Sequence, residues 1–552
     1  MAGGLLNLVA GGTQNEILYG NPQKTYWTST YKQITNFGIQ NFRLEYEGQR
    51  KIQMTTDTTF TFKVRRYAEL LTTTYLVMDL PDIYSPYYRV PKSTTVGGVT
   101  TTTYTYYPYE FKWIKNIGAM MIRNIKFMIG GNLIQNITGH DIVALANRDL
   151  NGTAKLKWDD MIGNVPELYD PALVHGNIYP NAIYSDPLGT PYVAGAEPSI
   201  RGRQLRVPLP IWWGMNSQQA FPLVCLQYNE LTIEVILRPL AELYQICNVV
   251  AESTNNEYPT DVIAPNMVIA EHQFNRFVNP PPEFGQVYPP NTTWFENVHL
   301  SCNYVFLSDE EAAMFASRPQ SYLIREIRDT LFQELNISDK VWLQNTSGLV
   351  LSWMMLFQRS DVNKRNEWSN YTNWPFNYIP NDVSRYVVNG QFIKDHLGRE
   401  IYLTGERRPE NVREILIRLG IIIDGVVREE LKPSSVYTHE QQYLTNYGAG
   451  YISLPGLNCY HFCLKTDPAN LQPSGAMNLS KYGKVELEFV THQPLMNPNG
   501  DFKVICDAFG EQIATAKTAA KTLLYYYNLL VIEERYNVIR FISGNAGLMN
   551  AR

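Results

Sequence analysis

Short runs in which apolar and polar residues alternate recur along most of this chain, and they constrain its fold more than any other feature. Residues 58–64, 231–237 and 484–490 each alternate in this way. A period of two sends successive side chains to opposite faces of a strand, so each run is typical of a strand with one buried face. Clusters of Gly, Pro, Asn and Thr separate the runs, as expected of β-sandwiches. The pattern therefore predicts an all-β fold.

Helical periodicity is scarce by comparison. It predicts helices only at 309–316, where Ser308 is a candidate N-cap, and near 510–521, which is rich in Ala and Lys. The chain has 552 residues, of which 12% are aromatic and 18% are charged. All-β domains can reach about 200–250 residues. Two large β domains therefore account for the length.

A weak internal duplication also favours two domains. Residues 121–129 form a candidate strand that runs into a Gly-Gly pair, and residues 414–423 run in the same way into an Asp-Gly pair. Both pairs are typical of tight hairpins. Later in each half, Tyr228 and Tyr482 precede an acidic strand. A repeated β domain with loops of unequal length explains these features, and chance similarity between strands is the alternative.

Proline marks the expected connection between the domains. Residues 279–290 are rich in Pro, which cannot donate to a strand ladder and stiffens a connection. The predicted organisation is an N-terminal arm at 1–25, a first β domain at 26–278, a linker at 279–293 and a second β domain at 294–552.

Two further stretches are predicted to be long surface loops. Residues 93–107 contain four consecutive Thr residues, and residues 158–200 are rich in Pro, Gly, Asn and Tyr. The second stretch is too aromatic for a disordered linker, so we expect it to pack on itself. Loops of this length usually carry function, and here we expect contact or display.

Charge and motif content argue against most biochemical activities. The formal net charge is -5 and no basic stripe is present, so the electrostatic basis of nucleic-acid binding is missing. The sequence contains no P-loop, dinucleotide fingerprint, nucleophile elbow or His-Glu-x-x-His motif. We predict no catalytic residues, no cofactor and no direct contact with nucleic acid. A glycosidase whose carboxylates converge from distant positions is the alternative left open.

One short segment contains residues that can ligate metals. Cys459, His461 and Cys463 would share one face of a strand. A zinc site needs a fourth ligand and usually a second close pair, and neither is visible in the sequence. We interpret the segment as a strand with one buried face and predict no metal site.

The N-terminal residues are apolar without resembling a membrane span or a secretory signal. Leu5, Leu6, Leu8 and Val9 belong to a stretch that is too short to span a bilayer and lacks a basic flank. We expect an arm that becomes ordered only against a neighbour.

Aromatic residues cluster at Trp368, Tyr371 and Trp374. They can stack on sugars, as in a lectin, or fill a subunit interface, where aromatic residues are enriched. We favour the interface. Candidate N-glycosylation triplets begin at Asn136, Asn151, Asn291, Asn336, Asn345, Asn370 and Asn478, although they predict little in a chain for which no secretory signal is expected.

Several short runs, in the same order along the chain, carry a resemblance to a known family. They include residues 20–27, 129–134, 207–213, 221–230, 472–480 and 536–544. The chain resembles the double jelly-roll major capsid proteins of nucleocytoplasmic large DNA viruses.

The resemblance implies two consecutive eight-stranded jelly-roll β-sandwiches with long loops and a few short helices. It implies a structural protein that homotrimerises into pseudo-hexameric capsomers, which tile the icosahedral shell of a large double-stranded DNA virus. Its partners would be further copies, minor capsid and penton proteins, and the internal viral membrane, after synthesis and assembly in the host cytoplasm. The apolar arm would clamp neighbours or face that membrane, and the long loops would point outward or between subunits.

Two other classes of protein fit parts of the sequence. A glycan-binding sandwich would use Trp368, Tyr371 and Trp374 and would bind sugar saturably as a monomer. A secreted glycoside-processing enzyme would show hydrolase activity, although the missing signal peptide and the low charge disfavour it.

Overall fold

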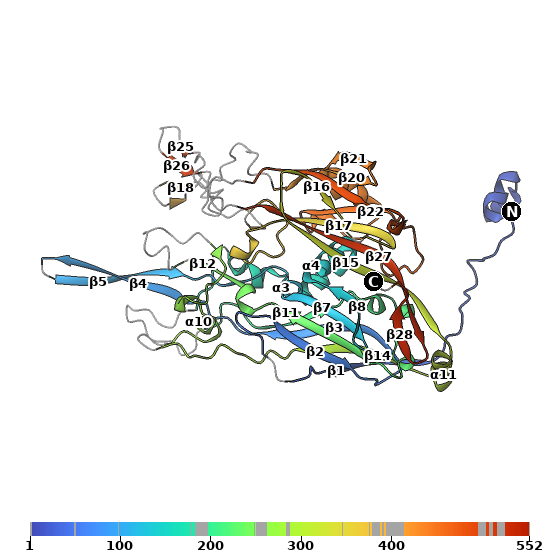
Figure 1. Ribbon diagram of the computed structural model, residues 1–552, viewed down its shortest axis with the longest axis horizontal. Coiled ribbons are helices and arrows are strands. Elements are labelled where there is room, and N and C mark those ends of the chain that lie inside the picture. The colour runs from blue at the N-terminus through green and yellow to red at the C-terminus, as the bar shows by residue number, and fades with distance from the viewer. Residues whose placement is uncertain are drawn as a thin grey trace.

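Two β-sandwiches lie one above the other in the computed structural model of the chain (Figure 1). The structure describes residues 3–48, 51–97, 99–176, 178–182, 197–247, 249, 262–282, 287–344, 346–374, 376–377, 387–388, 391–392, 413–494, 504–506, 512–515 and 525–550.

The first sandwich consists of two antiparallel sheets. One has the strand order β1-β14-β3-β10, with β9 also pairing with β3, and the other has the order β2-β11-β7-β8. Alternation of side chains builds the core, since Phe60 and Phe62 of β2 and Ile233 and Val235 of β11 all point inward and are fully buried. The strands are β1 (Phe37–Leu44), β2 (Thr58–Val64), β3 (Leu70–Leu80), β7 (Ile122–Ile129), β8 (Asn132–Ile137), β9 (Arg203–Pro208), β10 (Phe221–Pro222), β11 (Leu231–Leu237) and β14 (His299–Leu307).

The second sandwich repeats this arrangement. One sheet has the order β15-β27-β17-β22, with β23 pairing with β17 and β28 with β27, and the other has the order β16-β24-β20-β21. The strands are β15 (Gln320–Leu335), β16 (Ser338–Trp342), β17 (Leu349–Arg359), β20 (Leu416–Ile423), β21 (Val426–Pro433), β22 (Leu457–His461), β23 (Met477–Asn478), β24 (Val485–Thr491), β27 (Tyr527–Ile542) and β28 (Asn545–Leu548).

The strands of each sandwich pair in a nested order. The first strand pairs with the last long strand, as β1 does with β14 and β15 with β27. The second pairs with the one before the last, as β2 does with β11 and β16 with β24. This nesting of a long hairpin folded over on itself is the jelly-roll topology. The predicted all-β fold of two jelly rolls is confirmed.

The internal duplication predicted from the sequence corresponds to equivalent hairpins. Strands β7 and β8 are joined at Gly130 and Gly131, and β20 and β21 at Asp424 and Gly425, and all four residues have positive φ. Tight two-residue turns require this backbone region, which glycine adopts without strain.

The proline-rich stretch does not separate the two sandwiches. It precedes β14, which pairs with β1 and β3 and so completes the first sandwich. The first sandwich therefore extends to Leu307, whereas the sequence placed its end at 278, a linker at 279–293 and the second domain from 294. Proline makes a long connection within one jelly roll look the same in the sequence as a linker between two.

Two loop predictions and one helix prediction need correction. Residues 93–96 and 99–107 lie in a two-stranded ribbon rather than a loop, formed by β4 (Tyr87–Val96) and β5 (Val99–Pro108). Residues 158–200 include helical segments, although 177 and 183–196 lie outside the described residues. Within the predicted helix at 510–521, residues Gln512–Thr515 form strand β26, which pairs with β25 (Val504–Cys506).

The helices are short, and those after the N-terminal arm lie between strands. The predicted helix at 309–316 is confirmed as α11 (Asp309–Ser317). None of the helices in the described residues combines the length and apolar character that a membrane crossing requires. The others are α1 (Leu6–Val9), α2 (Glu16–Tyr19), α3 (Ile117–Met120), α4 (Gly139–Asp149), α5 (Gly152–Ile162), α6 (Pro166–Tyr169), α7 (Pro171–Val174), α8 (Trp212–Met215), α10 (Asn275–Val278) and α13 (Gln441–Tyr443). Further short strands are β6 (Lys112–Trp113), β12 (Tyr244–Cys247), β13 (Val262–Ile263), β18 (Val387–Val388) and β19 (Gln391–Phe392).

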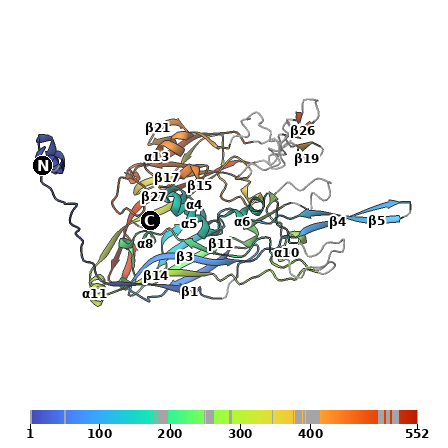
Figure 2. The same ribbon diagram turned by 180° about the vertical axis from the view of Figure 1, so that it is seen from behind.

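The N-terminal arm leaves the sandwiches at the end opposite to the β4–β5 ribbon. Both views show the arm on one side of the molecule and the ribbon on the other (Figure 2). Every described arm residue before β1 is exposed except Asn15, which is partly covered. The molecule therefore has two different ends.

Candidate functional site

The two sandwiches meet along a seam that joins them into one unit. Strand β8 of the first packs beside β15 and β28 of the second, and α4 packs beside a short turn at Gly450–Ile452. Met354, Leu356 and Ile532 of the second sandwich belong to the same buried cluster as the core of the first. The apolar core therefore continues across the seam.

Aromatic rings also cross the seam. The ring centroids of Trp212 and Tyr322 lie 5.8 Å apart, and those of Phe221 and Phe541 lie 5.3 Å apart with their planes nearly perpendicular. Aromatic pairs favour such tilted and edge-to-face arrangements.

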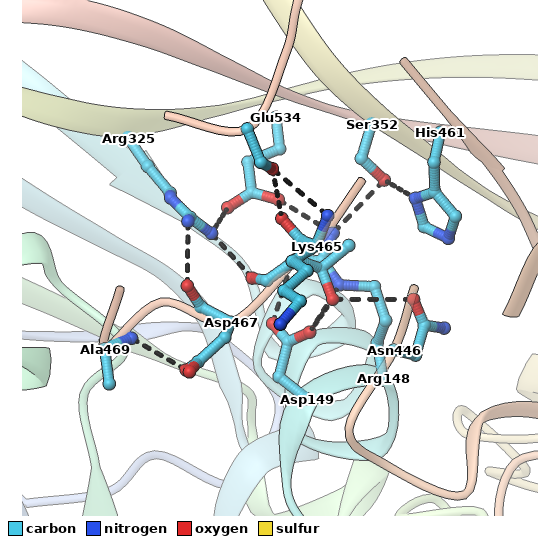
Figure 3. A network of polar contacts seen from close by, with 12 residues as sticks. Arg148, Asp149, Arg325, Ser352, Asn446, His461, Lys465, Asp467, Ala469 and Glu534 are labelled. Atoms are coloured by element: carbon cyan, nitrogen blue, oxygen red, sulfur yellow. Dashed lines mark hydrogen bonds and ion pairs between the residues drawn. The ribbon is translucent and has the colours of Figure 1, made fainter. Parts of the chain in front are cut away.

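A buried guanidinium group lies within this apolar seam (Figure 3). Arg148, near the end of α4, donates from Nε and Nη2 to the carboxylate of Asp149 at 2.9 and 2.7 Å. Its Nη1 lies 2.7 Å from Oε2 of Glu534 in β27 and donates to Oγ of Ser352 in β17 at 3.2 Å. One side chain of the first sandwich thus contacts two strands of the second.

A second arginine completes the charged cluster. Arg325 of β15 donates to the backbone carbonyls of Thr466 and Asp467 at 2.7 and 2.8 Å, and its Nη1 lies 3.4 Å from Oε1 of Glu534. The Thr466 hydroxyl donates to Oδ1 of Asp149 at 2.8 Å. Two guanidinium groups therefore face two carboxylates in this cluster. Burial would raise the pKa of Glu534, but Arg148 and Arg325 outweigh it and lower that pKa, so Glu534 is ionised.

A carboxyl pair forms a second polar contact across the seam. The hydroxyl of Thr138, the N-cap of α4, donates to Oδ2 of Asp141 at 2.9 Å and lies 3.2 Å from Oδ2 of Asp329 in β15. Oδ1 of Asp141 and Oδ1 of Asp329 are buried and have no other hydrogen-bond partner among the described residues. One proton held between the two carboxyl groups would satisfy both atoms.

The surroundings of this pair favour the protonated state. Burial, reinforced by the charge of Asp329, raises the pKa of Asp141 well above its ordinary value. Burial also raises the pKa of Asp329. The pair therefore keeps a proton at pH values where exposed carboxyl groups have lost theirs.

Two half-buried histidines serve the packing rather than acid–base chemistry. Nδ1 of His461 lies 3.0 Å from Oγ of Ser352, and Nδ1 of His140 lies 2.6 Å from the hydroxyl of Tyr371. Burial, assisted by nearby arginines, lowers the pKa of each histidine to about 3. Both imidazoles are neutral near pH 7, so neither accepts a proton there.

The segment with Cys459, His461 and Cys463 belongs to the core. Cys459 and Cys463 are buried, and burial raises the pKa of Cys459 to about 12. Such a thiol behaves as a small apolar side chain. Among the residues that the structure describes, no three His, Cys, Asp or Glu side chains come close enough to hold a metal ion.

The aromatic cluster contacts the first sandwich of the same chain. Tyr371 is 2% exposed. Trp368 donates from Nε1 to the carbonyl of Glu242 at 2.9 Å, and the Arg238 guanidinium lies 4.3 Å from the centre of its ring. Trp374 is partly buried. An exposed sugar-stacking surface built on Tyr371 is therefore wrong. Trp368 and Tyr371 fill a contact between the two sandwiches of one chain, whereas a subunit interface was predicted for them.

The glycosylation triplets differ in accessibility. Asn370 is 1% exposed and donates to the Trp374 carbonyl at 2.9 Å, so it cannot accept a glycan in the folded chain. Asn345 lies outside the described residues. The exposed positions are Asn136, Asn151, Asn291, Asn336 and Asn478.

The charged residues of the seam were not predicted from the sequence. Arg148, Asp149, Arg325 and Glu534 are scattered along the chain, and no local pattern links them. The spacing of Thr138 and Asp141 does match a helix-capping box, which predicts the start of α4.

A known family matches the first half of the chain. Its description is "Major capsid protein N-terminus", and it covers residues 25–308, more than half of the 552 residues. The chain belongs to this family. The match ends one residue after β14, where the first jelly roll is complete.

Curated relatives are named as major capsid proteins. The major capsid protein of Chrysochromulina ericina virus is 26% identical over 355 residues, which cover 60% of this chain and 53% of that protein. The major capsid protein of Paramecium bursaria Chlorella virus 1 is 23% identical over 551 residues and is covered over its full length, as is this chain. The chain spans about half the length of the first curated relatives that it matches.

Solved structures share the fold at low sequence identity. The Faustovirus major capsid protein matches with a TM-score of 0.61 at 12% identity, covering 93% of this chain and 92% of that one. A chain of the PBCV-1 virus capsid matches with a TM-score of 0.58 at 16% identity, covering 96% and 100%. The double jelly-roll fold is thereby confirmed. Its family places the chain among structural capsid proteins rather than enzymes, as the sequence predicted.

Removing the buried guanidinium should weaken the seam of this capsid-family chain. In Arg148→Met, Asp149 and Glu534 lose their main cationic partner inside the seam. Breaking one side of a buried ion pair typically costs about 3–5 kcal/mol. We expect the free energy of unfolding in urea to fall by about that amount.

The matched control is Lys157→Met, an exposed cation on the neighbouring helix α5. Its stability should stay within about 0.5 kcal/mol of wild type, as is usual for surface changes. Equal losses in both variants would show that the seam charge has no special role.

The carboxyl pair should make stability depend on pH. Because folding raises the pKa of both Asp141 and Asp329, the folded chain binds more protons than the unfolded chain above the ordinary carboxyl value of 3.8. The stability that the pair adds is therefore fully present below pH 3.8 and is lost as the pH rises toward the raised pKa. In Asp329→Asn, an amide can donate to Asp141 without titrating, so the melting temperature should fall less between about pH 5 and pH 8 than in wild type.

The control for this change is Asp309→Asn, which removes an exposed carboxylate at the start of α11. Thermal melts should give this variant the wild-type pH profile. If the melting temperature of Asp329→Asn fell with pH as steeply as that of wild type, the shared proton would be contradicted.

Proposed function

We propose that three copies of the chain associate into a pseudo-hexameric capsomer, and that capsomers tile the icosahedral shell of a large double-stranded DNA virus. The observation that carries the proposal is the repetition of a single strand order in two sandwiches that lie side by side in one chain. Three such chains around an axis present six similar units at the rim. A ring of this kind closes through head-to-tail contacts.

The rigidity of the seam supports this role. The continuous core and the Arg148 cluster hold the two sandwiches in one relative orientation. A pseudo-hexagonal block needs such a fixed orientation, because six neighbours must each meet a rim of the correct shape. A flexible joint between the sandwiches would give variable rims.

The two ends of the molecule support an inner and an outer side. The N-terminal arm and the β4–β5 ribbon lie at opposite ends (Figures 1 and 2). Leu8 and Val9 are 80% and 72% exposed, and an apolar surface of this kind needs an apolar partner. We assign the arm to the inner side, where neighbouring capsomers, minor capsid proteins or the internal membrane would cover it, and the ribbon to the outer side.

The remaining partners and the location follow from the same role. Penton proteins would close the shell at its vertices, and the chain would be made and assembled in the host cytoplasm before it reaches the virion. The jelly rolls leave few sheet edges open, which suits a protein packed at high concentration.

The mass of the purified protein tests the proposal. We expect a stable trimer of about 190 kDa by light scattering, three times the 63.3 kDa of the chain, and no dissociation on dilution. A monomer at every concentration would overturn the capsomer assignment.

Charge placed on the arm should separate trimer formation from shell assembly. In the double variant Leu8→Asp, Val9→Asp, the arm carries charge where an apolar partner has to bind. We expect trimers of normal mass and a severalfold loss of larger assemblies, measured by sedimentation of lysates in which the virus assembles. Gln14→Asp, in the same arm, is the control, and wild-type shell yields in the double variant would refute the inner-side role.

A further inference from the structure

The seam inside the chain shows how two sandwiches of this kind fit together. The first sandwich contributes an edge, formed by strand β8 and helix α4. The second contributes the outer face of the sheet that contains β15, β27 and β17, where Tyr322, Ile532 and Met354 pack against the core of the first sandwich. An edge of one sandwich therefore lies on the outer sheet face of the next.

The two sandwiches point the same way along the molecule. Phe37 begins β1 and pairs with Leu307, the last residue of β14, which is followed by α11. Gln320 begins β15 shortly after that helix. Both β1 and β15 therefore start at the α11 end, and both run from there toward the opposite end (Figure 1). A rotation about the long axis, without an end-over-end turn, relates the two sandwiches.

The second sandwich has an edge equivalent to the one that the first buries in the seam. Strands β8 and β21 each follow a hairpin turn with Gly and each end their sheet. In β8, which lies beside β15 and β28, Ile134, Gln135 and Ile137 are buried. In β21, every residue is at least partly exposed, and Val426 and Val427 are 70% and 56% exposed. No further strand joins β21 among the described residues.

The helical segments that follow the two edge strands differ in the same way. Helix α4 follows β8, and α13 follows β21. Arg148, near the end of α4, is fully buried in the seam, whereas Tyr443 and Leu444, at the end of α13, are both 82% exposed. Exposed apolar groups that gather in this way mark an interaction surface. We call β21 together with Tyr443 and Leu444 the free edge.

The first sandwich has an outer sheet face equivalent to the one that the second buries in the seam. Leu44 of β1 belongs to the core and Phe42 packs against it. Alternation then directs Phe37 and Ile39 outward, where they are 50% and 62% exposed. Ile324 of β15, the first strand of the other sandwich, is fully buried in the core that crosses the seam. We call the outward side of β1 and β14 the free face.

Polar groups on the free face are already satisfied within the chain. Asn41 donates to Asn303 at 2.8 Å and accepts from Ser301 at 3.1 Å. Asn303 in turn donates to the hydroxyl of Thr73 at 2.6 Å. A row of this kind is compatible with water before association, and it leaves few polar groups without partners when water is excluded. The face therefore suits a contact that forms between chains after each has folded.

We propose that the free edge of one copy packs on the free face of a second copy, in a repeat of the seam. The internal seam joins the counterparts of these two surfaces, so their shapes are of a kind that fits. Each chain carries both halves, and the halves differ from one another. Contacts between unlike halves run head to tail, and such contacts can close a ring.

The direction of the contact agrees with an inner and an outer side. Because the seam rotates one sandwich about the long axis, its repetition rotates the next chain about the same axis. All arms then lie at one end of the assembly and all β4–β5 ribbons at the other (Figures 1 and 2). This inference rests on the proposed capsomer and names the surfaces that build it, so that contacts within and between chains alternate around the ring.

A charge on either half should block ring closure. Ile39→Asp changes the free face, and Leu444→Asp changes the free edge. Both side chains are exposed in the single chain, so each variant should fold with the melting temperature of wild type. By light scattering, we expect monomers of 63.3 kDa and at least a severalfold loss of trimer from each variant. Val268→Asp, at a 91% exposed position outside both surfaces, is the control and should form trimers like wild type.

Mixing the two variants tests whether the halves bind each other. Ile39→Asp keeps an intact free edge, and Leu444→Asp keeps an intact free face. One contact can therefore form between them, and it cannot close into a ring. An equimolar mixture should contain dimers of about 127 kDa, twice the 63.3 kDa of the chain, and no trimers. Neither variant should form dimers alone.

The outcomes separate this inference from the proposed function. Folded Ile39→Asp or Leu444→Asp that forms trimers as wild type does, or a mixture that contains no dimers, would overturn the contact between free edge and free face and leave the capsomer in place. A wild-type chain that never trimerises would overturn the proposed function instead.

Discussion

Burial of β17 on both faces is the constraint on which the rest of the structure depends. Trp353, Met355 and Phe357 point into the core of the second sandwich, whereas Met354 and Leu356 point into the core that it shares with the first. A strand of this kind has no face for solvent. Separating the sandwiches would expose a row of apolar side chains, each worth about 1.5–3 kcal/mol of burial. The two jelly rolls are therefore one folding and mechanical unit, which is the property that a shell block needs.

Apolar contact alone does not determine how two such surfaces align, because the hydrophobic effect has no direction. The hydrogen bonds that the Arg148 guanidinium donates do have a direction. The guanidinium is held by Asp149 on its own helix and reaches Glu534 across the seam, so a small shift between the sandwiches would leave buried charges without partners. The charged cluster therefore specifies the alignment, and the surrounding apolar residues provide most of the adhesion. The carboxyl pair near Thr138 adds a second fixed point on the same helix.

The sequence predicted those parts of the fold where one local rule decides the outcome. Alternation in β2 and β24 revealed half-buried strands, and the Gly-containing turns at 130–131 and 424–425 revealed the repeat. It failed where tertiary context overrides local signals. Ala and Lys favour a helix near 512, yet the segment there is a strand, and Pro before β14 looked like a boundary between domains. The Thr-rich ribbon was predictable in retrospect, because β-branched residues on both sides of a Gly-Gly pair favour a hairpin. The charged seam was not, because its members meet only after folding.

The nested pairing of strands has a consequence for synthesis. Asn41 donates to Asn303, so the strand that opens the first jelly roll has to wait for most of that domain to be made before it finds its partner. The same delay affects β15, whose partner β27 comes far later in the chain. Contacts so distant in sequence form slowly, and unpaired strand edges stay available to other nascent chains in the meantime. On a crowded polysome, a chain with this topology has to be kept from pairing with neighbouring nascent chains until β1 has paired with β14 and β15 with β27.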